Sequence, residues 1–166
     1  MNPSQNRRAL CCLLALAALA ACSPNAPPAG AEVHAGALRI SAATSRATPI
    51  AGVTGAGYLK IENAGESDEV LLGASAEVAS GVELHEMSTV DDVMRMRALP
   101  EGLRIPAGGH VELAAGGTHL MLLGVKRPLI AGEKLPVTLR FARTGEVRVD
   151  LLVQALTADE GDRTGH

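Results

Sequence analysis

Two histidines and four methionines stand in three short runs of this chain and could together bind a metal. The runs are His85-Glu86-Met87, Met94-Arg95-Met96 and His119-Leu120-Met121. They hold every methionine of the chain except the initiator. A thioether is a soft ligand that suits Cu(I), and imidazole also binds copper. In a chain with only one tyrosine, one phenylalanine and no tryptophan, this concentration of soft ligands indicates metal binding better than core packing.

Strand geometry would place the potential ligands of each run on one side. Residues i and i+2 of a strand point to the same face. The pairs that then share a face are His85 with Met87, Met94 with Met96, and His119 with Met121. Two such strands brought side by side could supply two nitrogens and two sulfurs, which suits a three- or four-coordinate Cu(I) site.

Some of these residues have an ordinary structural alternative. A methionine in a strand usually fills a core, so we interpret Met94 as a packing residue, whereas Met87 is an even choice between packing and an auxiliary ligand. His110, which follows two glycines, is expected on a solvated face. The other candidates are expected in solvent as well: His34, His166, Glu83, Glu86, Asp91 and Asp92.

The first residues read as an export signal. Arg7 and Arg8 precede a short apolar stretch, Ala9 to Ala21, which is too short to span a bilayer comfortably. The run Leu19-Ala20-Ala21-Cys22 resembles a bacterial lipobox, in which cleavage leaves a lipidated cysteine at the N-terminus. An ordinary signal peptide is the alternative. The paired arginines are weak evidence for twin-arginine export, and general secretion is preferred.

Cysteine usage then excludes several kinds of chemistry. Cys11 and Cys12 fall within the removed peptide, and Cys22 carries the anchor, so no free thiol or disulfide remains. A zinc–thiolate site, a cysteine nucleophile and a blue-copper site, which needs a cysteine ligand, are therefore excluded. With a net charge of −3 and no basic patch, nucleic acid is not an expected partner.

The expected organisation is a signal peptide over 1–21, a lipidated tether over 22–32 rich in Pro, Ala and Gly, one β domain over 33–156, and a disordered polar tail over 157–166. Short apolar runs between Gly, Pro and Asn are typical of an all-β sandwich or barrel. The expected strands are 37–41, 57–62, 69–74, 81–87, 93–98, 110–113, 118–123, 134–141 and 146–154. The last two are expected to form a hairpin around Arg143-Thr144-Gly145.

The chain resembles the periplasmic copper chaperone PCuAC family. That family is marked by a histidine, ten residues, a methionine, twenty-one residues and then His-x-Met. Ten residues separate His85 from Met96, and His119-Leu120-Met121 closes the motif. Flanking segments also match, including Ile105-Pro106-Ala107-Gly108-Gly109. The resemblance extends over about Leu38 to Val153, nearly the whole domain.

Two departures from the family pattern are visible. Twenty-two residues, not twenty-one, separate Met96 from His119, and we place the extra residue in the turn at Pro100-Glu101-Gly102, where insertions cost little. The family's tryptophan near Thr44 is missing, which concerns packing and not the ligands. The resemblance implies a cupredoxin-like, Greek-key fold and carries the Cu(I) ligands over to His85, Met96, His119 and Met121.

The expected function is that of a periplasmic, membrane-tethered Cu(I) chaperone and not of an enzyme. The resemblance implies delivery to copper centres such as the copper subunit of cytochrome c oxidase, alongside thiol-bearing Sco-type proteins. Ser23 after Cys22 favours the outer membrane slightly. Two alternatives remain: a lipoprotein that sequesters copper for resistance without handing it on, and a structural immunoglobulin-like lipoprotein that binds no metal.

Overall fold

The structure is a computed structural model that describes residues 30–90 and 93–156. The regular secondary structure of this part of the chain consists of β-strands alone, which confirms the all-β prediction. The strands are β1 (Val33–Ala35), β2 (Leu38–Arg46), β3 (Gly55–Asn63), β4 (Glu69–Ser75), β5 (Gly81–Val90), β6 (Val93–Ala98), β7 (Leu103–Ile105), β8 (His110–Leu113), β9 (Thr118–Leu123), β10 (Lys134–Phe141) and β11 (Gly145–Gln154).

Several expectations concern residues beyond these ranges. The export signal, Cys22, most of the tether and the tail all lie outside the described residues, as do Asp91 and Asp92. The first described residue is Gly30, whose amide donates to the carbonyl of Ala43 at 2.9 Å. Within the described ranges there is no helix with the length and apolar character needed to cross a bilayer.

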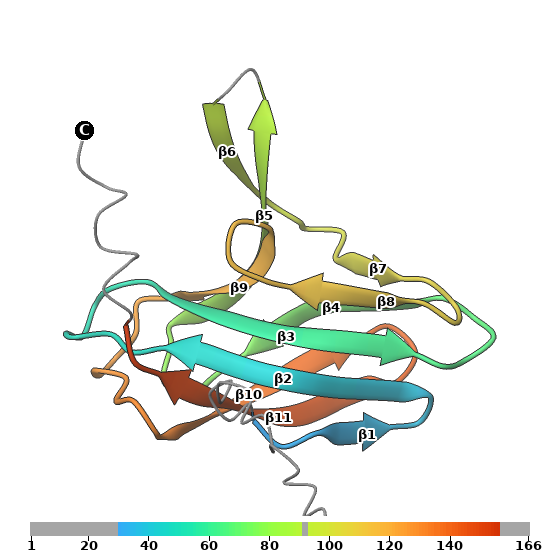
Figure 1. Ribbon diagram of the computed structural model, residues 1–166, viewed down its shortest axis with the longest axis horizontal. Coiled ribbons are helices and arrows are strands. Elements are labelled where there is room, and N and C mark those ends of the chain that lie inside the picture. The colour runs from blue at the N-terminus through green and yellow to red at the C-terminus, as the bar shows by residue number, and fades with distance from the viewer. Residues whose placement is uncertain (1–29, 91–92, 157–166) are drawn as a thin grey trace, which may run out of the picture.

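Hydrogen bonds join the strands into one open sheet that folds over itself (Figure 1). The strand order is β6-β5-β9-β3-β2-β11-β10-β4-β7, with β1 beside β2 and β8 beside β3. All pairs are antiparallel except β11 with β2. Because β3 and β9 are neighbours, the strand that carries His119 is held directly against the centre of the sheet.

The strand β2 continues past its expected end at Ser41 and contains a β-bulge. The register with β3 shifts between Ser41 and Thr44, and Ala42 has a positive φ of 52°. Before the bulge β2 pairs with β1, and after it β2 pairs with β11. A bulge bends the strand and strengthens its twist, so the same strand serves two different neighbours.

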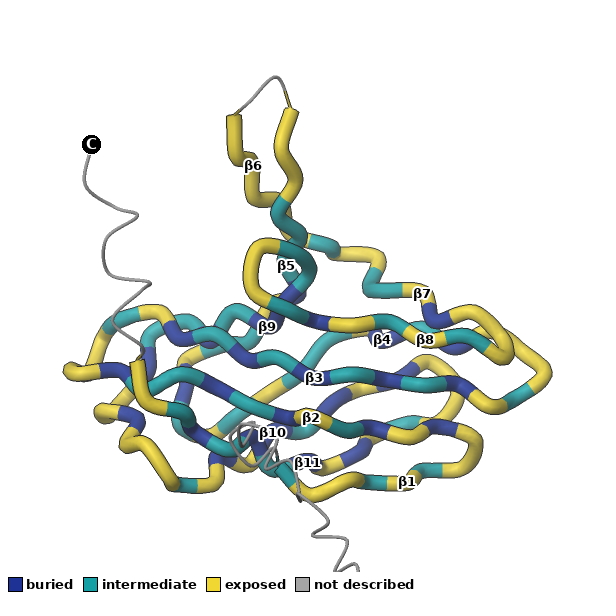
Figure 2. Tube along the Cα trace, in the orientation of Figure 1, coloured by how far each residue is buried: buried dark blue, intermediate teal, exposed yellow. Residues whose placement is uncertain are grey.

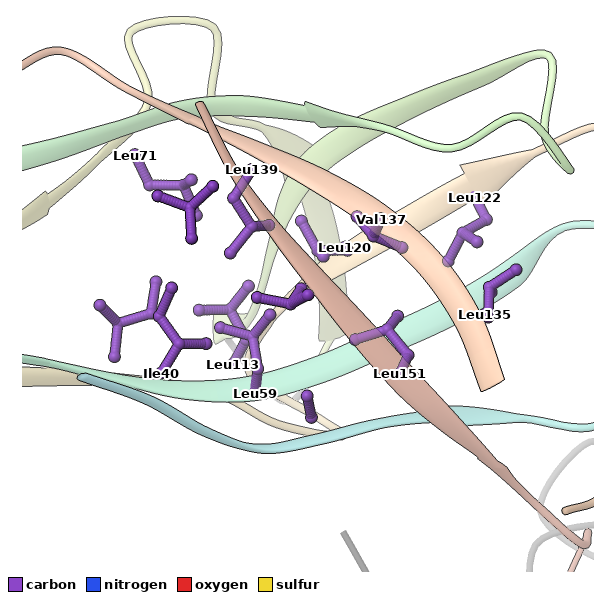
Figure 3. Close-up of a cluster of buried hydrophobic side chains, with 14 of the residues drawn as sticks. Ile40, Leu59, Leu71, Leu113, Leu120, Leu122, Leu135, Val137, Leu139 and Leu151 are labelled. Carbon is purple, nitrogen blue, oxygen red and sulfur yellow. The ribbon is translucent and has the colours of Figure 1, made fainter. Parts of the chain in front are cut away.

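The core lies inside the folded sheet and is made almost entirely of aliphatic side chains. Every second residue of β3 and β10 is buried, as expected for strands with one inward face. Figure 3 shows Leu71 and Leu139 on one side of this cluster and Ile40 and Leu59 on the other. Each such side chain contributes about 1.5–3 kcal/mol by leaving water, so the fold needs few aromatic residues.

Among the described strands, the β5–β6 hairpin projects from this body (Figure 1). All six residues of β6 are exposed, and Figure 2 shows the exposed end of the hairpin standing clear of the buried strands. Only the first half of β5 pairs with β9, while its second half pairs with β6. Within the described residues, the hairpin is therefore anchored at one end by β9, and its far end is exposed.

All nine expected strands are present. The bounds of β6, β8, β9 and β10 agree with the prediction, and the hairpin turn is confirmed by the pairing of Phe141 with Gly145. The short strands β1 and β7 were not predicted. Each has three residues, which is too few to show a period in the sequence.

A buried carboxylate ties the start of β4 to the β10–β11 turn. Glu69 is 4% exposed. Its Oε1 accepts hydrogen bonds from the amides of Val70 (2.9 Å) and Arg143 (3.0 Å), and its Oε2 accepts from the amide (2.9 Å) and hydroxyl (2.8 Å) of Thr144. Burial acts to raise the pKa of Glu69, but the hydrogen bonds together outweigh it, and the pKa is lowered from its usual value.

We expect Glu69→Gln to destabilise the domain by about 1–3 kcal/mol at pH 7, because the amide cannot accept all four bonds. A lowered carboxyl pKa gives stability that is complete above the ordinary glutamate range and is lost as pH falls through the folded-state pKa. The gap between parent and variant should thus shrink below about pH 4. Urea unfolding at pH 7 and pH 3 measures the difference in the free energy of unfolding between parent and variant. The control is Glu146→Gln, on the exposed side of the same hairpin. An equal gap at both pH values would contradict this role.

Candidate metal centre

The strands β6, β5 and β9 lie side by side and carry all of the candidate ligands. His85 on β5 stands opposite His119 on β9, and Met87 on β5 stands opposite Met96 on β6. Directly opposed residues of an antiparallel pair project from the same face. The two histidines and two methionines therefore share one face of this three-stranded unit, as the strand pattern predicted.

The opposite face of the same strands fixes this register. Leu84 stands opposite Leu120, and both are buried, at 4% and 0% exposure. A slip of one residue would move both leucines out of the core and both histidines to the other face. Core burial thus places the two imidazoles side by side without help from any ligand.

Two candidate ligands approach each other between β5 and β6. The Nδ1 atom of His85 lies 3.1 Å from the Sδ atom of Met96. The ring of His119 is also nearby, because the His85 and His119 ring centroids are 6.2 Å apart in an edge-on arrangement. One thioether and two imidazoles from three strands therefore converge.

A carboxylate fixes the orientation of His85. Its Nε2 atom lies 2.8 Å from Oε2 of Glu83, two residues earlier on the same face of β5. Because an ionised carboxylate only accepts hydrogen bonds, Nε2 carries the proton. The free lone pair is then on Nδ1, the atom that faces Met96. A carboxylate on the far nitrogen is a common way to orient a metal-binding histidine.

A backbone carbonyl fixes the orientation of His119. Its Nδ1 atom lies 3.0 Å from the oxygen of Gly117, which leaves Nε2 as the free donor. The same oxygen accepts the amide of Met87 at 3.2 Å. The tight turn before β9 depends on Gly116, which has a positive φ of 80°. This turn thus orients His119 and links it to β5.

Exposure rises from β9 outward. The residue His119 is 8% exposed, the side chain of His85 is 14% exposed, and Met96 on β6 is 50% exposed. Met94 is 64% exposed and stands opposite Thr89. The interpretation of Met94 as a packing residue is therefore wrong, because β6 lies outside the core.

Two further methionines are placed on the ligand face. Met121 stands opposite Glu83, two residues beyond His119, and Met87 is half-buried beside Met96. The geometry brings His85, Met96 and His119 together and sets Met121 next to them. That these residues bind metal remains a prediction.

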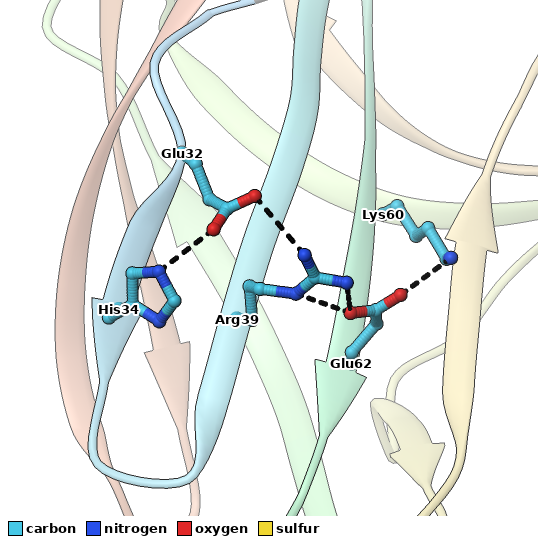
Figure 4. A network of polar contacts seen from close by, with 5 residues as sticks. All are labelled: Glu32, His34, Arg39, Lys60 and Glu62. Carbon is cyan, nitrogen blue, oxygen red and sulfur yellow. Dashed lines mark hydrogen bonds and ion pairs between the residues drawn. The ribbon is translucent and has the colours of Figure 1, made fainter.

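The other polar candidates lie elsewhere. His34 is bound to Glu32 at 2.8 Å in a surface network with Arg39 and Glu62 (Figure 4). His110 on β8 is exposed, as expected. Glu86 points to the other face of β5 and pairs with Arg97 at 2.6 Å.

Sequence reasoning missed the contribution of Glu83 and Gly117. Glu83 is exposed, as expected, but its contact with His85 was not predicted, although its position two residues before His85 was a signal that both share a face. The carbonyl of Gly117 gave no signal, because a backbone group contacts a side chain only once the turn is formed.

The hydrogen bonds predict opposite tautomers for the two histidines. At neutral pH, His85 should carry its proton on Nε2 and His119 on Nδ1, since each donates to an oxygen that only accepts. Long-range nitrogen–proton NMR spectra distinguish these forms, and the exposed His110 serves as the reference. A shared tautomer for His85 and His119 would contradict the geometry.

A family model described as "Putative lipoprotein LpqE-like" matches residues 38–153 of this chain. The curated protein "Putative lipoprotein Lxx21020" from Leifsonia xyli subsp. xyli (strain CTCB07) is 42% identical over 87 residues. That match spans 52% of each chain, so it covers about half the length of the relative.

Two solved structures place the fold. The copper-bound PCuAC domain from PmoF2 superposes with a TM-score of 0.63 at 23% identity, over 76% of this chain and 99% of that one. The solution structure of CuI-DR1885 from Deinococcus radiodurans has a TM-score of 0.50 at 31% identity, over 68% of this chain and 78% of that one. The resemblance to PCuAC domains, and with it the cupredoxin-like fold, is confirmed. The chain belongs to the family described as "Putative lipoprotein LpqE-like", and its domain has the PCuAC fold.

Proposed function

We propose that this protein binds one Cu(I) ion and passes it to an acceptor protein. The ligands are Nδ1 of His85, Nε2 of His119 and the sulfurs of Met96 and Met121. The observation that carries the proposal is the 3.1 Å approach of His85 Nδ1 to Met96 Sδ, beside the ring of His119. Two imidazole nitrogens with free lone pairs and two thioethers form a donor set that fits Cu(I).

The same donor set disfavours zinc. Zinc sites are built from thiolate, imidazole and carboxylate ligands. Among residues 30–90 and 93–156, no three His, Cys, Asp or Glu residues are grouped to hold a metal ion. The thioethers add no charge to compensate a divalent ion, whereas they suit a soft monovalent one.

The relatives support this choice of metal. The structure from Deinococcus radiodurans that is 31% identical is named as a Cu(I) form. The role proposed here is that of a carrier and not of an enzyme, and copper is its cargo.

The absence of cysteine from the ligand set favours release to a thiol-bearing partner. A thiolate is a stronger Cu(I) ligand than a thioether, so copper would move downhill to a cysteine-containing acceptor. We propose the copper subunit of cytochrome c oxidase as the acceptor class, with a Sco-type thiol protein as an intermediate partner. Sequestration without transfer is the competing function.

Lipidation of Cys22 would hold the domain at a membrane on the periplasmic side, with the outer membrane favoured. The lipobox-like run before Cys22 and the family's description as lipoproteins support the anchor. A short flexible tether raises the effective concentration of the domain near a membrane-bound acceptor.

A Cu(I) competition titration tests the site. We expect one equivalent of Cu(I) to bind in preference to Zn(II). Glu83→Gln should weaken Cu(I) binding about 10–100-fold, because the amide orients His85 less firmly. The matched control is Glu86→Gln, which changes a glutamate on the opposite face of β5 and should leave the affinity for Cu(I) unchanged. Tighter binding of Zn(II) than Cu(I) would argue against the proposed ligand set.

Handover is tested by mixing the Cu(I)-loaded protein with the apo copper domain of an oxidase subunit. Transfer of copper to the cysteines of that domain supports a chaperone. Retention of copper by this protein in the presence of excess acceptor would point to sequestration instead.

The anchor is tested by Cys22→Ser in cells. The variant should leave the membrane fraction, either as a soluble or as an uncleaved form, while its purified domain still binds Cu(I). If parent and variant partition with membranes equally, and neither shows the mass of an acylated N-terminus, the protein is a freely diffusing periplasmic carrier.

A further inference from the structure

The projecting β5–β6 hairpin carries a face made of three methionines. Met87 stands opposite Met96, and Met94 lies two residues before Met96 on β6, so all three side chains share one face. The other face of the hairpin tip carries Val93 and Arg95. The three thioethers are therefore segregated from the charged side of the same hairpin.

Packing does not account for this face. Met94 and Met96 are 64% and 50% exposed, and Met87 is only half-buried. Figure 2 shows this end of the hairpin away from the buried strands. Exposed methionine loses the favourable free energy that burial would give, about 1.5–3 kcal/mol for a complete side chain. A set of three on one exposed face thus calls for a use other than stability.

Met96 belongs to this face and to the inner site at once. Its sulfur lies 3.1 Å from Nδ1 of His85, while its backbone is paired with Met87. Methionine has three rotatable bonds and a polarizable sulfur, so Met96 can turn between the histidines and the outer thioethers. An ion held by Met87, Met94 and Met96 would therefore keep one ligand while it moves inward.

We propose that Met87, Met94 and Met96 form an outer, all-thioether Cu(I) site through which copper enters and leaves the inner site. This inference rests on the proposed Cu(I) function. The step is ligand exchange alone: copper stays monovalent, its bonds to Met87 and Met94 break, and bonds to His85, His119 and Met121 form. Met96 stays bound throughout, so the ion never becomes free. Release to an acceptor is the reverse sequence.

The outer site is expected to govern the rate of copper transfer and not the affinity of the inner site for Cu(I). In the purified full-length protein, Met94→Leu should leave the affinity for the first Cu(I) within about twofold but slow its transfer to the chelator bicinchoninate about tenfold. Leucine keeps a similar volume and removes only the sulfur. Val93→Leu, a neighbour on the opposite face that is 55% exposed, is the matched control and should transfer copper at the parent rate.

Methionine methyl NMR gives a second readout. In the variant His85→Asn/His119→Asn, where the inner histidines no longer compete for the ion, one equivalent of Cu(I) should shift the methyl signals of Met87, Met94 and Met96. In the same background, Met87→Leu/Met94→Leu should abolish the shift at Met96.

Two results would overturn the outer site. One is parent-like transfer by Met94→Leu together with an unmoved Met94 methyl signal. The other is a tenfold or greater loss of affinity for the first equivalent, which would make Met94 an inner ligand. Failure of the proposed function itself looks different, because the parent would then not bind even the first equivalent.

Discussion

The pairing of β5 with β9 is the constraint on which the rest of this site depends. It sets His85 opposite His119 and, on the reverse side, Leu84 opposite Leu120. Because the leucines are buried in the core, any slip that separates the histidines also exposes apolar surface. The free energy that holds the imidazoles together is therefore hydrophobic, and it is available before any metal binds.

From that pairing the molecule divides into a fixed inner half and an exposed outer half. His119 is buried and bonded to the Gly117 carbonyl, whereas Met96 sits half-exposed on a strand with no inward face. A carrier must both retain its cargo and give it up. In the proposed carrier, the rigid imidazoles would serve retention, since little entropy is lost when preorganised groups bind. The flexible thioethers on the hairpin would serve exchange, since their rotamers are free to change.

Features of this site that depend on local sequence could be predicted, whereas features that depend on which strands become neighbours could not. Alternation along one strand is local, so the shared face of His85 and Met87 and the bounds of β6 could be predicted. Which strands become neighbours is not local: β5 and β9 are brought together across three intervening strands. Met94 was misassigned for a related reason. Methionine usually indicates a core position, and only the sheet order shows that β6 lies at the edge of the sheet, outside the core. The orientation of His85 by Glu83 was within reach of the same alternation.

The choice of sulfur ligand has a thermodynamic consequence for the proposed role. A thiolate must lose a proton before it binds metal, whereas a thioether binds without one. The proposed inner site would therefore bind copper with no competition from protons at its sulfurs. It would also hold copper less firmly than a pair of thiolates would. Both features favour a site that loads readily and yields its ion to a cysteine-bearing acceptor. The orienting bonds to Glu83 and Gly117 offset part of that weakness, because they fix the imidazoles in the tautomers that bind. In the proposed site the strength of copper retention would thus depend on the groups that orient the histidines as much as on the thioether sulfurs.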